Sequence, residues 1–187
     1  MPMAKTNRDL LSSERFAARS GAVFLIRRLK ADDYENVRAY LRSFAAETVF
    51  TNQYPGQPEK SKEQLTKGYA DENALYLGVF ADDRLIGASS VKIERPGHPW
   101  ARNAVFGIGM LKDFYHQGIG TELMIRMENW AREKRVHRIE GLVRTANLPA
   151  IGLYLKRGFV IEGRKRECAL IDGVWHDEYV IAKLLTS

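Results

Sequence analysis

Short blocks of hydrophobic and polar residues follow one another along this chain, and their period changes repeatedly between two and about 3.6 residues. Blocks that alternate, or that are continuously apolar, predict strands at 23–28, 75–80, 85–93, 103–110, 139–143, 160–171 and 174–184. Blocks with the longer period predict helices at 32–46, 63–70, 118–134 and 148–157. The order of these elements predicts an α/β domain built on a sheet of mixed strand direction.

The segment 118–134 has the clearest helical pattern. Its apolar residues recur on one face, namely Ile119, Leu123, Met127 and Trp130. Acid-before-base pairs four residues apart follow elsewhere on the helix, at Glu122/Arg126 and Glu128/Arg132. We expect these charged pairs on the solvent-exposed outer face.

The domain boundaries follow from the same pattern. Residues 21–187 are predicted to form one domain, and residues 1–20 an N-terminal arm or a short amphipathic helix. A length of 187 residues is enough to bury one full core and too short for two large domains. The first 20 residues carry charges with no apolar block, so we do not expect them to form a signal peptide.

Composition excludes several classes of protein. No apolar run approaches the roughly 20 residues that span a bilayer, so we expect a cytoplasmic protein with no membrane partner. The single cysteine, Cys168, excludes an internal disulfide. The four histidines are scattered without metal-ligand spacing, so we expect no metal.

The net charge of +6 favours polyanions, either nucleic acid, an acidic membrane or a phosphate-rich cofactor. A solvated basic surface explains the charge equally well. A nucleic-acid-binding module would need clustered Lys and Arg with exposed aromatic residues between them, which the sequence lacks. We therefore expect no nucleic-acid partner.

A glycine-containing segment joins the strand 103–110 to the helix 118–134. It reads Phe114-Tyr115-His116-Gln117-Gly118-Ile119-Gly120-Thr121. Glycine lets the backbone approach a ligand closely, and the unpaired N–H groups at the positive end of a helix favour a phosphate or pyrophosphate. The segment is not a P-loop, because no Gly-Lys-Ser/Thr follows, and it is not a dinucleotide fingerprint, because Leu123 stands where the third glycine would be. A tight strand-to-helix turn without a ligand is the alternative.

A second segment, 147–159, begins with Asn147 and carries Tyr154 seven residues later. The two side chains lie on nearly the same helical face, roughly 10 Å apart along the axis. One face therefore offers an amide and a phenol to an elongated ligand. The alternative is that Asn147 is only an N-cap and that Tyr154 only packs in the core.

Together the two segments resemble the GNAT superfamily of acyl-CoA-dependent N-acyltransferases, over about 23–184 of the chain. The C-terminal part of this region resembles one branch of the superfamily, which includes the ribosomal-protein N-terminal, spermidine and phosphinothricin acetyltransferases. The family signature, Arg/Gln-x-x-Gly-x-Gly/Ala, has Tyr115 at its first position here, while both glycines fit. The resemblance implies a single domain with a mixed, mostly antiparallel central sheet flanked by helices. It also implies acetyl-CoA as co-substrate.

The resemblance also implies the site residues. Those expected to contact the cofactor are Ile108, Gly109, Met110, His116, Gln117, Gly118, Ile119, Gly120, Thr121, Asn147, Tyr154 and Lys156. Tyr154 matches the family's frequent general acid. Ribosomal-protein acetyltransferases often carry a glutamate base where Leu142 stands, so Glu140 on the same strand face is the substitute candidate. A surface carboxylate is an equally good interpretation of Glu140.

The predicted reaction is direct attack of a primary amine on the thioester, with a backbone N–H near Met110 for the oxyanion. The acceptor is expected to be a small metabolite amine or a protein N-terminal α-amine, ranked above spermidine because 45–73 offers no anionic funnel. Acetyl transfer through Cys168 is less favoured, since no histidine neighbours it in the sequence. A non-catalytic acyl-CoA-binding domain with a protein partner is the alternative function. Both a monomer and a homodimer are compatible with the sequence.

Overall fold

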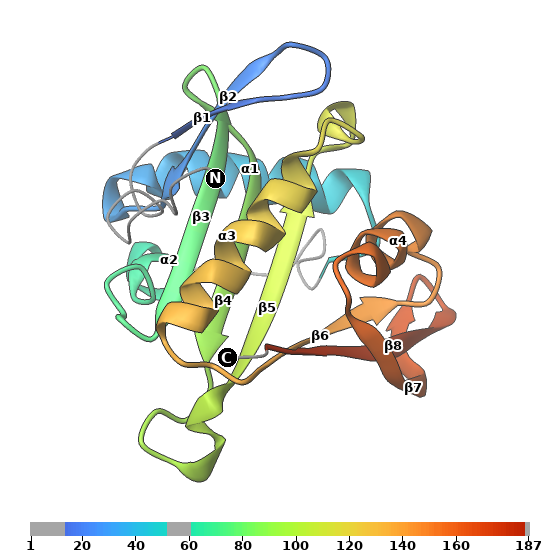
Figure 1. Ribbon diagram of the computed structural model, residues 1–187. Coiled ribbons are helices and arrows are strands. Elements are labelled where there is room, and N and C mark those ends of the chain that lie inside the picture. Colours follow the sequence, from blue (N-terminus) through green and yellow to red (C-terminus); the bar gives the residue numbers. More distant parts are fainter. Residues whose placement is uncertain (1–13, 52–60, 186–187) are drawn as a thin grey trace.

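A mixed sheet of eight strands runs through the protein (Figure 1). The computed structural model describes residues 14–51 and 61–185. In chain order the strands are β1 (Glu14–Ala17), β2 (Val23–Arg28), β3 (Ala74–Ala81), β4 (Arg84–Ile93), β5 (Asn103–Met110), β6 (Arg138–Arg144), β7 (Val160–Ile171) and β8 (Val174–Leu184). Their order in the sheet is β1-β2-β3-β4-β5-β6-β8-β7. Only β5 and β6 are parallel among these neighbours, as expected for a mixed, mostly antiparallel sheet.

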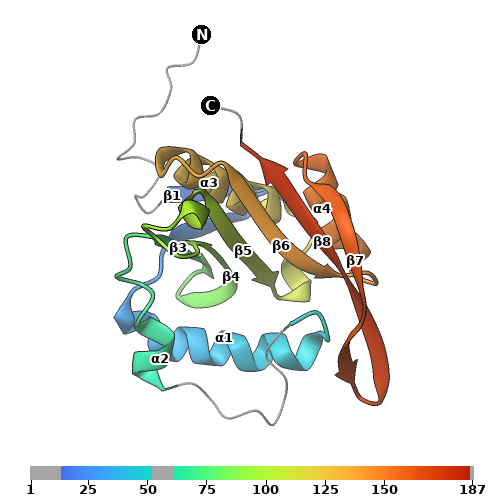
Figure 2. The same cartoon turned by 90° about the horizontal axis from the view of Figure 1, so that it is seen from below.

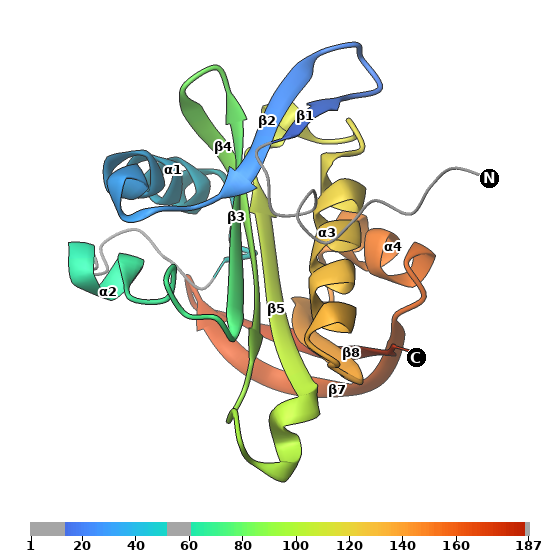
Figure 3. The same cartoon turned by 60° about the vertical axis from the view of Figure 1, so that its left-hand side comes forward.

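Helices cover both faces of the sheet. They are α1 (Tyr34–Glu47), α2 (Lys62–Thr66), α3 (Ile119–Glu133) and α4 (Leu148–Lys156). The view from below and the turned view place α1 and α2 on one face, and α3 and α4 on the other (Figures 2 and 3). The predicted helix 63–70 is shorter than expected, because its polypeptide leaves the helix at Lys67, just before Gly68. None of the helices in the described part of the chain is long and apolar enough to cross a membrane.

The N-terminal segment corrects one expectation. The residues Glu14–Ala17 form strand β1, paired with β2, where the sequence pattern predicted an arm or a helix up to residue 20. Residues 1–13 lie outside the described range. Arg126 of α3 links the helix to this strand by donating a hydrogen bond to Glu14 at 3.0 Å, and it also donates to Glu122, one turn earlier on α3, at 2.8 Å. A strand added at the sheet edge was not recognisable, because its four residues contain one apolar pair at most and no turn signal precedes them.

Two charged residues expected on the outer face of α3 are buried instead. Arg126 is 4% exposed and Glu128 is 1% exposed. Glu128 accepts hydrogen bonds from Arg157 and Lys183, and Arg132 lies 3.7 Å from it. The predicted i,i+4 pairs therefore exist, but β1 and α4 cover them. The buried carboxylate of Glu128, surrounded by Arg132, Arg157 and Lys183, joins α3, α4 and β8.

The parallel strands β5 and β6 separate soon after they begin. Their register covers only Asn103–Val105 against Arg138–Glu140, although β5 continues to Met110 and β6 to Arg144. Figure 1 shows the two strands diverging, with α4 beside the end of β6. Within residues 14–51 and 61–185, one edge of the second half of β5 therefore has no neighbouring strand, and both cavities described below open there.

Candidate functional site

The turn between β5 and α3 has the backbone conformation that its glycines suggested. Gly118 is the N-cap of α3 and has φ +87°, in the left-handed region that favours glycine. His116, two residues earlier, also has a positive φ of 61°. The helix begins at Ile119, so the N–H groups of its first turn face the space in front of the turn. This is the geometry that an anion or a phosphate group requires.

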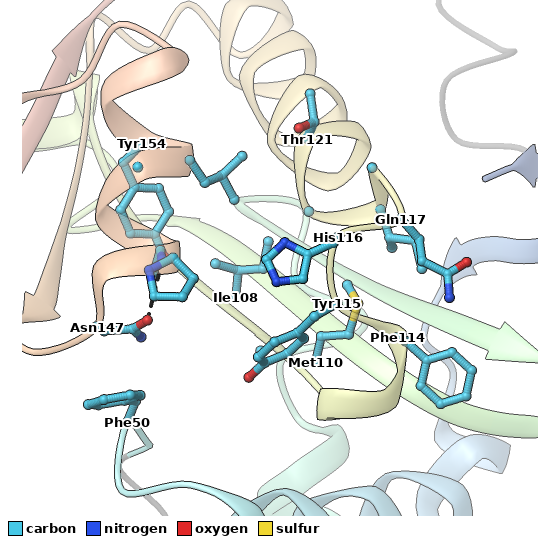
Figure 4. A pocket seen from close by; sticks show the side chains of 18 of the residues that line it. Phe50, Ile108, Met110, Phe114, Tyr115, His116, Gln117, Thr121, Asn147 and Tyr154 are labelled. Carbon is cyan, nitrogen blue, oxygen red and sulfur yellow. Dashed lines mark hydrogen bonds between the residues drawn. The ribbon is translucent and has the colours of Figure 1, made fainter. Parts of the chain in front are cut away.

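A cavity of about 430 Å³ lies in front of this turn. Every residue predicted to contact a cofactor lines it, from Ile108 on β5 to Lys156 on α4. Figure 4 shows Tyr154 and Asn147 on the α4 side, with His116 facing them and Phe50 at the lower edge. The sequence motifs therefore converge on one space. That these residues bind a cofactor there remains a prediction.

The backbone of β5 presents polar groups to this space. The N–H of Leu111 donates to the carbonyl of Ile86 on β4 at 2.9 Å. Because successive backbone groups along a strand point to opposite edges, the N–H groups of Met110 and Ile108 point away from β4, into the gap between β5 and β6. An extended ligand can therefore pair with β5 as an added strand would.

The glycines of β5 serve different neighbours. A Cβ on Gly109 would lie 2.8 Å from both Phe44 and the hydroxyl of Tyr40, so this glycine admits the aromatic side chains of α1. Among the described residues, a Cβ on Gly107 would meet only Ser90, at an ordinary 3.6 Å. Packing against α1 inside the protein therefore accounts for a glycine at 109, although the residue also lines the cavity.

Asn147 and Tyr154 combine structural and cavity-lining positions. The Asn147 side chain caps α4 by accepting a hydrogen bond from the N–H of Ala150 at 3.3 Å, so the residue is an N-cap and also lines the cavity. The Tyr154 ring packs edge-on against Phe106 with 5.2 Å between centroids. Tyr154 is 5% exposed, and burial raises the pKa of its phenol well above its usual range. The phenol therefore stays protonated at neutral pH and can donate a proton.

A second cavity of about 670 Å³ lies on the α1 and α2 side of β5. Aromatic rings dominate its wall, namely Tyr40, Phe44, Phe50, Tyr69, Tyr76, Phe106 and Tyr154. Burial beside a second phenol raises the pKa of Tyr69 to about 12, so this ring is also neutral. The two cavities share six residues: Phe44, Phe50, Ile108, Gly109, Asn147 and Tyr154. The spaces therefore meet beside β5, with Tyr154 at the junction.

Glu140 does not reach this junction. Its carboxylate accepts a hydrogen bond from Arg138 at 2.7 Å, and it lines neither cavity. It lies on β6 opposite Val105, where β5 and β6 are still paired, so the strands have not yet separated there. The structure thus brings Tyr154 and the cofactor candidates together and leaves Glu140 outside.

The sequence and the fold match a known enzyme family. The model of the acetyltransferase (GNAT) family matches residues 36–159. The chain belongs to the GNAT family of acetyltransferases. Members of this family use acetyl-CoA. No group of three or more His, Cys, Asp or Glu residues able to hold a metal ion occurs within 14–51 and 61–185.

The chain is similar over most of its length to individual GNAT proteins, in sequence or in fold. The L-amino acid N-acetyltransferase AaaT of Escherichia coli is 31% identical over 166 residues, which cover 86% of this chain and 97% of the relative. A GNAT acetyltransferase structure from Streptococcus pneumoniae has a TM-score of 0.79 and 27% identity, covering 87% of this chain and 99% of its own. The fold of yncA from Salmonella typhimurium, solved with its cofactor acetyl-CoA, matches at a TM-score of 0.75 and 15% identity, covering 88% of this chain and 95% of its own.

Three charged residues of this GNAT domain line the cavities without having been expected there. Arg19, in the turn between β1 and β2, lines the first cavity. Its backbone N–H donates a hydrogen bond to the backbone carbonyl of Gln117 at 3.3 Å. Arg144 and Glu178 line the second cavity. No local motif contains any of the three, because the sheet and the β1–β2 turn bring them to the site from distant segments. Only the structure could identify them.

Proposed function

We propose that this acetyltransferase moves the acetyl group of acetyl-CoA directly to a primary amine, with the α-amine of an amino acid or peptide as acceptor. The observation that carries the proposal is the junction of the two cavities. One cavity ends at a helix N-terminus suited to pyrophosphate, and the other is an aromatic chamber that reaches the same stretch of β5. The name of the E. coli relative, an L-amino acid N-acetyltransferase, supports an α-amine.

The first cavity fits acetyl-CoA. The N–H groups at the start of α3 would receive the pyrophosphate, and the exposed edge of β5 would pair with the pantetheine arm. Tyr115 replaces the Arg or Gln of the family signature. Arg19 stands close by, because a Cβ on Gly118 would lie 4.0 Å from its Nε. Arg19 would therefore supply a cationic contact from the β1–β2 turn.

The geometry supports direct transfer at the junction. The neutral amine attacks the thioester carbonyl from the second cavity, and the N–H of Met110 stabilises the oxyanion of the tetrahedral intermediate. As the intermediate collapses, the C–S bond breaks, and Tyr154 donates its proton to the CoA thiolate. The attacking nitrogen became positively charged on attack and gives up one proton, directly or through water, to the Tyr154 phenolate, so that a neutral amide and CoA result and the phenol is restored. An α-amine, with a pKa of about 8, is partly neutral at pH 7 and needs little help from a base.

An acetylation panel with acetyl-CoA tests the proposal. Free amino acids, peptides that begin with Ala or Ser, and spermidine are compared by the rate of CoA release. We expect the highest kcat/KM for α-amines. Tight CoA binding without turnover on any amine would instead indicate a non-catalytic binding domain. A kcat/KM for spermidine far above all others would overturn the choice of acceptor.

A further inference from the structure

A cluster of exposed cations lies at one end of the sheet, away from both cavities. The connection from β4 to β5 (94–102) and the connection from α3 to β6 (134–137) meet at this end, opposite the end at which α3 begins (Figure 1). The backbone N–H of His137 donates to the carbonyl of Arg102 at 2.8 Å, so the two connections are in direct contact. Together they carry four exposed cations that line neither cavity: Arg95, Arg102, Lys134 and Arg135.

One of these arginines stands where the backbone favours glycine. Arg135 follows the last turn of α3 with φ +56°, and the N–H of Val136 donates to the carbonyl of Ala131 at 2.8 Å. Helices commonly end in this way, with a glycine that avoids the steric cost of the left-handed conformation. The Arg135 side chain makes no hydrogen bond or ion pair with the part of the chain that the structure describes. The end of the helix therefore does not explain an arginine at this position.

A second arginine of the cluster has the same property. Arg95, two residues after the end of β4, has φ +54° and an exposed side chain. Its carbonyl accepts a hydrogen bond from the N–H of His98 at 3.1 Å, so only its backbone contributes to the turn. Its guanidinium makes no hydrogen bond or ion pair within residues 14–51 and 61–185. At both positions glycine would suit the backbone better, and both guanidinium groups are available to a ligand.

An exposed tryptophan lies between the arginines of the first connection. Trp100 is 56% exposed, and its carbonyl accepts a hydrogen bond from the N–H of Asn103 at the start of β5. It is the only large apolar side chain exposed in the two connections, 94–102 and 134–137. An indole ring offers a face on which a nucleic-acid base can stack, and a guanidinium matches the geometry of a phosphate.

We infer that this surface binds single-stranded nucleic acid, with a base stacked on Trp100 and with phosphates paired to Arg95, Arg102 and Arg135. This inference goes beyond acetyl transfer and does not depend on which amine is the acceptor. A membrane surface fits less well, because membrane-binding segments insert several apolar side chains and this surface exposes one. No single segment contains clustered cations with an aromatic residue, so the sequence predicted no nucleic-acid partner. The fold assembles the cluster from two segments.

The neighbouring carboxylates do not cancel the four cations. Glu94 lies in the first connection, and Glu133 ends α3 just before the second. Glu133 already interacts with Arg28 of β2. Asp71 and Glu72, shortly before β3, belong to the α2 side of the sheet rather than to either connection. Cations therefore remain in excess where the two connections meet, as a polyanion requires.

The first test measures binding of fluorescently labelled oligouridine and oligothymidine, each about 12 nucleotides long, to the unmodified protein by fluorescence anisotropy. We expect a Kd of about 1–100 μM at physiological salt. A plot of log K against log salt should have a slope of about −3, because each of the four cations releases about 0.7 counterion from a single strand. Tighter binding of one strand would identify RNA or DNA as the ligand. No binding of either strand at low salt, or equally tight binding of a duplex, would overturn the inference.

The second test combines Arg95→Gly with Arg135→Gly. Affinity for the oligonucleotide should fall about tenfold, and the salt slope should become shallower by about 1.4, or about 0.7 for each cation removed. The Tm should stay constant or rise, because glycine suits both backbone positions, so a loss of binding cannot be attributed to damage to the fold. Lys165→Ala with Arg166→Ala removes the same charge from the exposed edge strand β7 and should change affinity little. Unchanged affinity in the glycine variant, or an equal loss in this control, would overturn the inference.

The third test separates stacking from charge. Trp100→Ala should weaken oligonucleotide binding about tenfold and leave binding of heparin, a polyanion without bases, unchanged. Trp175→Ala is the matched control, because Trp175 is also 56% exposed but lies on β8. Full affinity of Trp100→Ala for the oligonucleotide would overturn the inference, as would tight binding of phosphatidylserine vesicles by a protein that does not bind the oligonucleotide.

Acetylation of free amino acids by Trp100→Ala should equal that of the unmodified protein. The eight residues of β5 separate this surface from the junction of the cavities by about 25 Å. A loss of nucleic-acid binding with full acetyl transfer therefore supports the inference and leaves the proposed function intact. A loss of acetyl transfer in this variant would instead overturn the separation of the two sites.

Discussion

Glu128, in the middle of α3, accepts two hydrogen bonds from Arg157, which ends α4, at 3.0 and 2.9 Å. Lys183 of β8 donates to the same carboxylate at 2.8 Å. One buried group thus fixes the position of α4 against α3 and the sheet. Because α4 carries Asn147 and Tyr154, the width of the first cavity depends on this contact.

Glu128→Ala should strongly destabilise the fold. The substitution leaves Arg157 and Lys183 around a buried space without their counter-charge, which typically costs about 3–5 kcal/mol. The free energy of unfolding, measured by urea denaturation, checks this value. Glu35→Ala serves as control, because its exposed pair with Arg38 on α1 should contribute less than about 1 kcal/mol. Equal effects of both substitutions would contradict the role given to Glu128.

Arg19→Ala should weaken CoA binding about tenfold, which corresponds to about 1.4 kcal/mol for a charge-assisted contact. Calorimetric titration with CoA measures this change, and the difference from the unmodified protein should shrink at high salt because the contact is electrostatic. Arg15→Ala is the matched control, since Arg15 is an exposed residue of β1 that does not line the cavity. An unchanged Kd for Arg19→Ala would remove this residue from the cofactor site.

Much of the first cavity could be predicted from the sequence because its residues are local. The strand β5, the glycine turn and the start of α3 follow one another directly, and the bounds of β5 match the hydrophobic pattern. Asn147 and Tyr154 lie on one short helix, whose spacing fixes their common face. Because these residues are neighbours both in the sequence and in space, hydrophobic periodicity and the chemistry of helix ends were enough to predict that they line one cavity.

The acceptor side could not be predicted in this way. Arg144 and Glu178 are 34 residues apart and meet only through the register of β6 with β8. Glu140 shares a strand face with Leu142. Hydrophobic periodicity does not reveal where β5 and β6 separate, and so the sequence could not show that Glu140 lies where the two strands are still paired. Charged residues on an amphipathic helix are ordinarily exposed, and the burial of Glu128 depends on partners in distant segments.

Gly120→Val should abolish CoA binding in a protein that remains folded. A Cβ at this position would lie 3.1 Å from a methyl group of Leu153, so a branched side chain must push α4 away or extend over the helix N-terminus. Either movement takes the first-turn N–H groups out of reach of a pyrophosphate. Gly163→Val, in β7, is the control, because no atom of the described part of the chain lies within 4 Å of its Cβ position. CoA affinity that survives in Gly120→Val would contradict the assignment of the turn.

Tyr154→Phe should reduce turnover and leave cofactor binding unchanged. The substitution keeps the ring, its packing against Phe106 and the shape of the junction, and removes only the hydroxyl that would protonate the thiolate. General acid catalysis is typically worth about 10²–10⁴-fold, so kcat should fall by that factor while the Kd for CoA stays constant. Because burial raises the pKa of this phenol, the unmodified enzyme should show no alkaline loss of kcat from Tyr154 between pH 7 and about pH 9. Tyr179→Phe is the control, since that residue of β8 lines neither cavity. A Tyr154→Phe variant with full kcat at neutral pH would show that water or another group protonates the leaving thiolate.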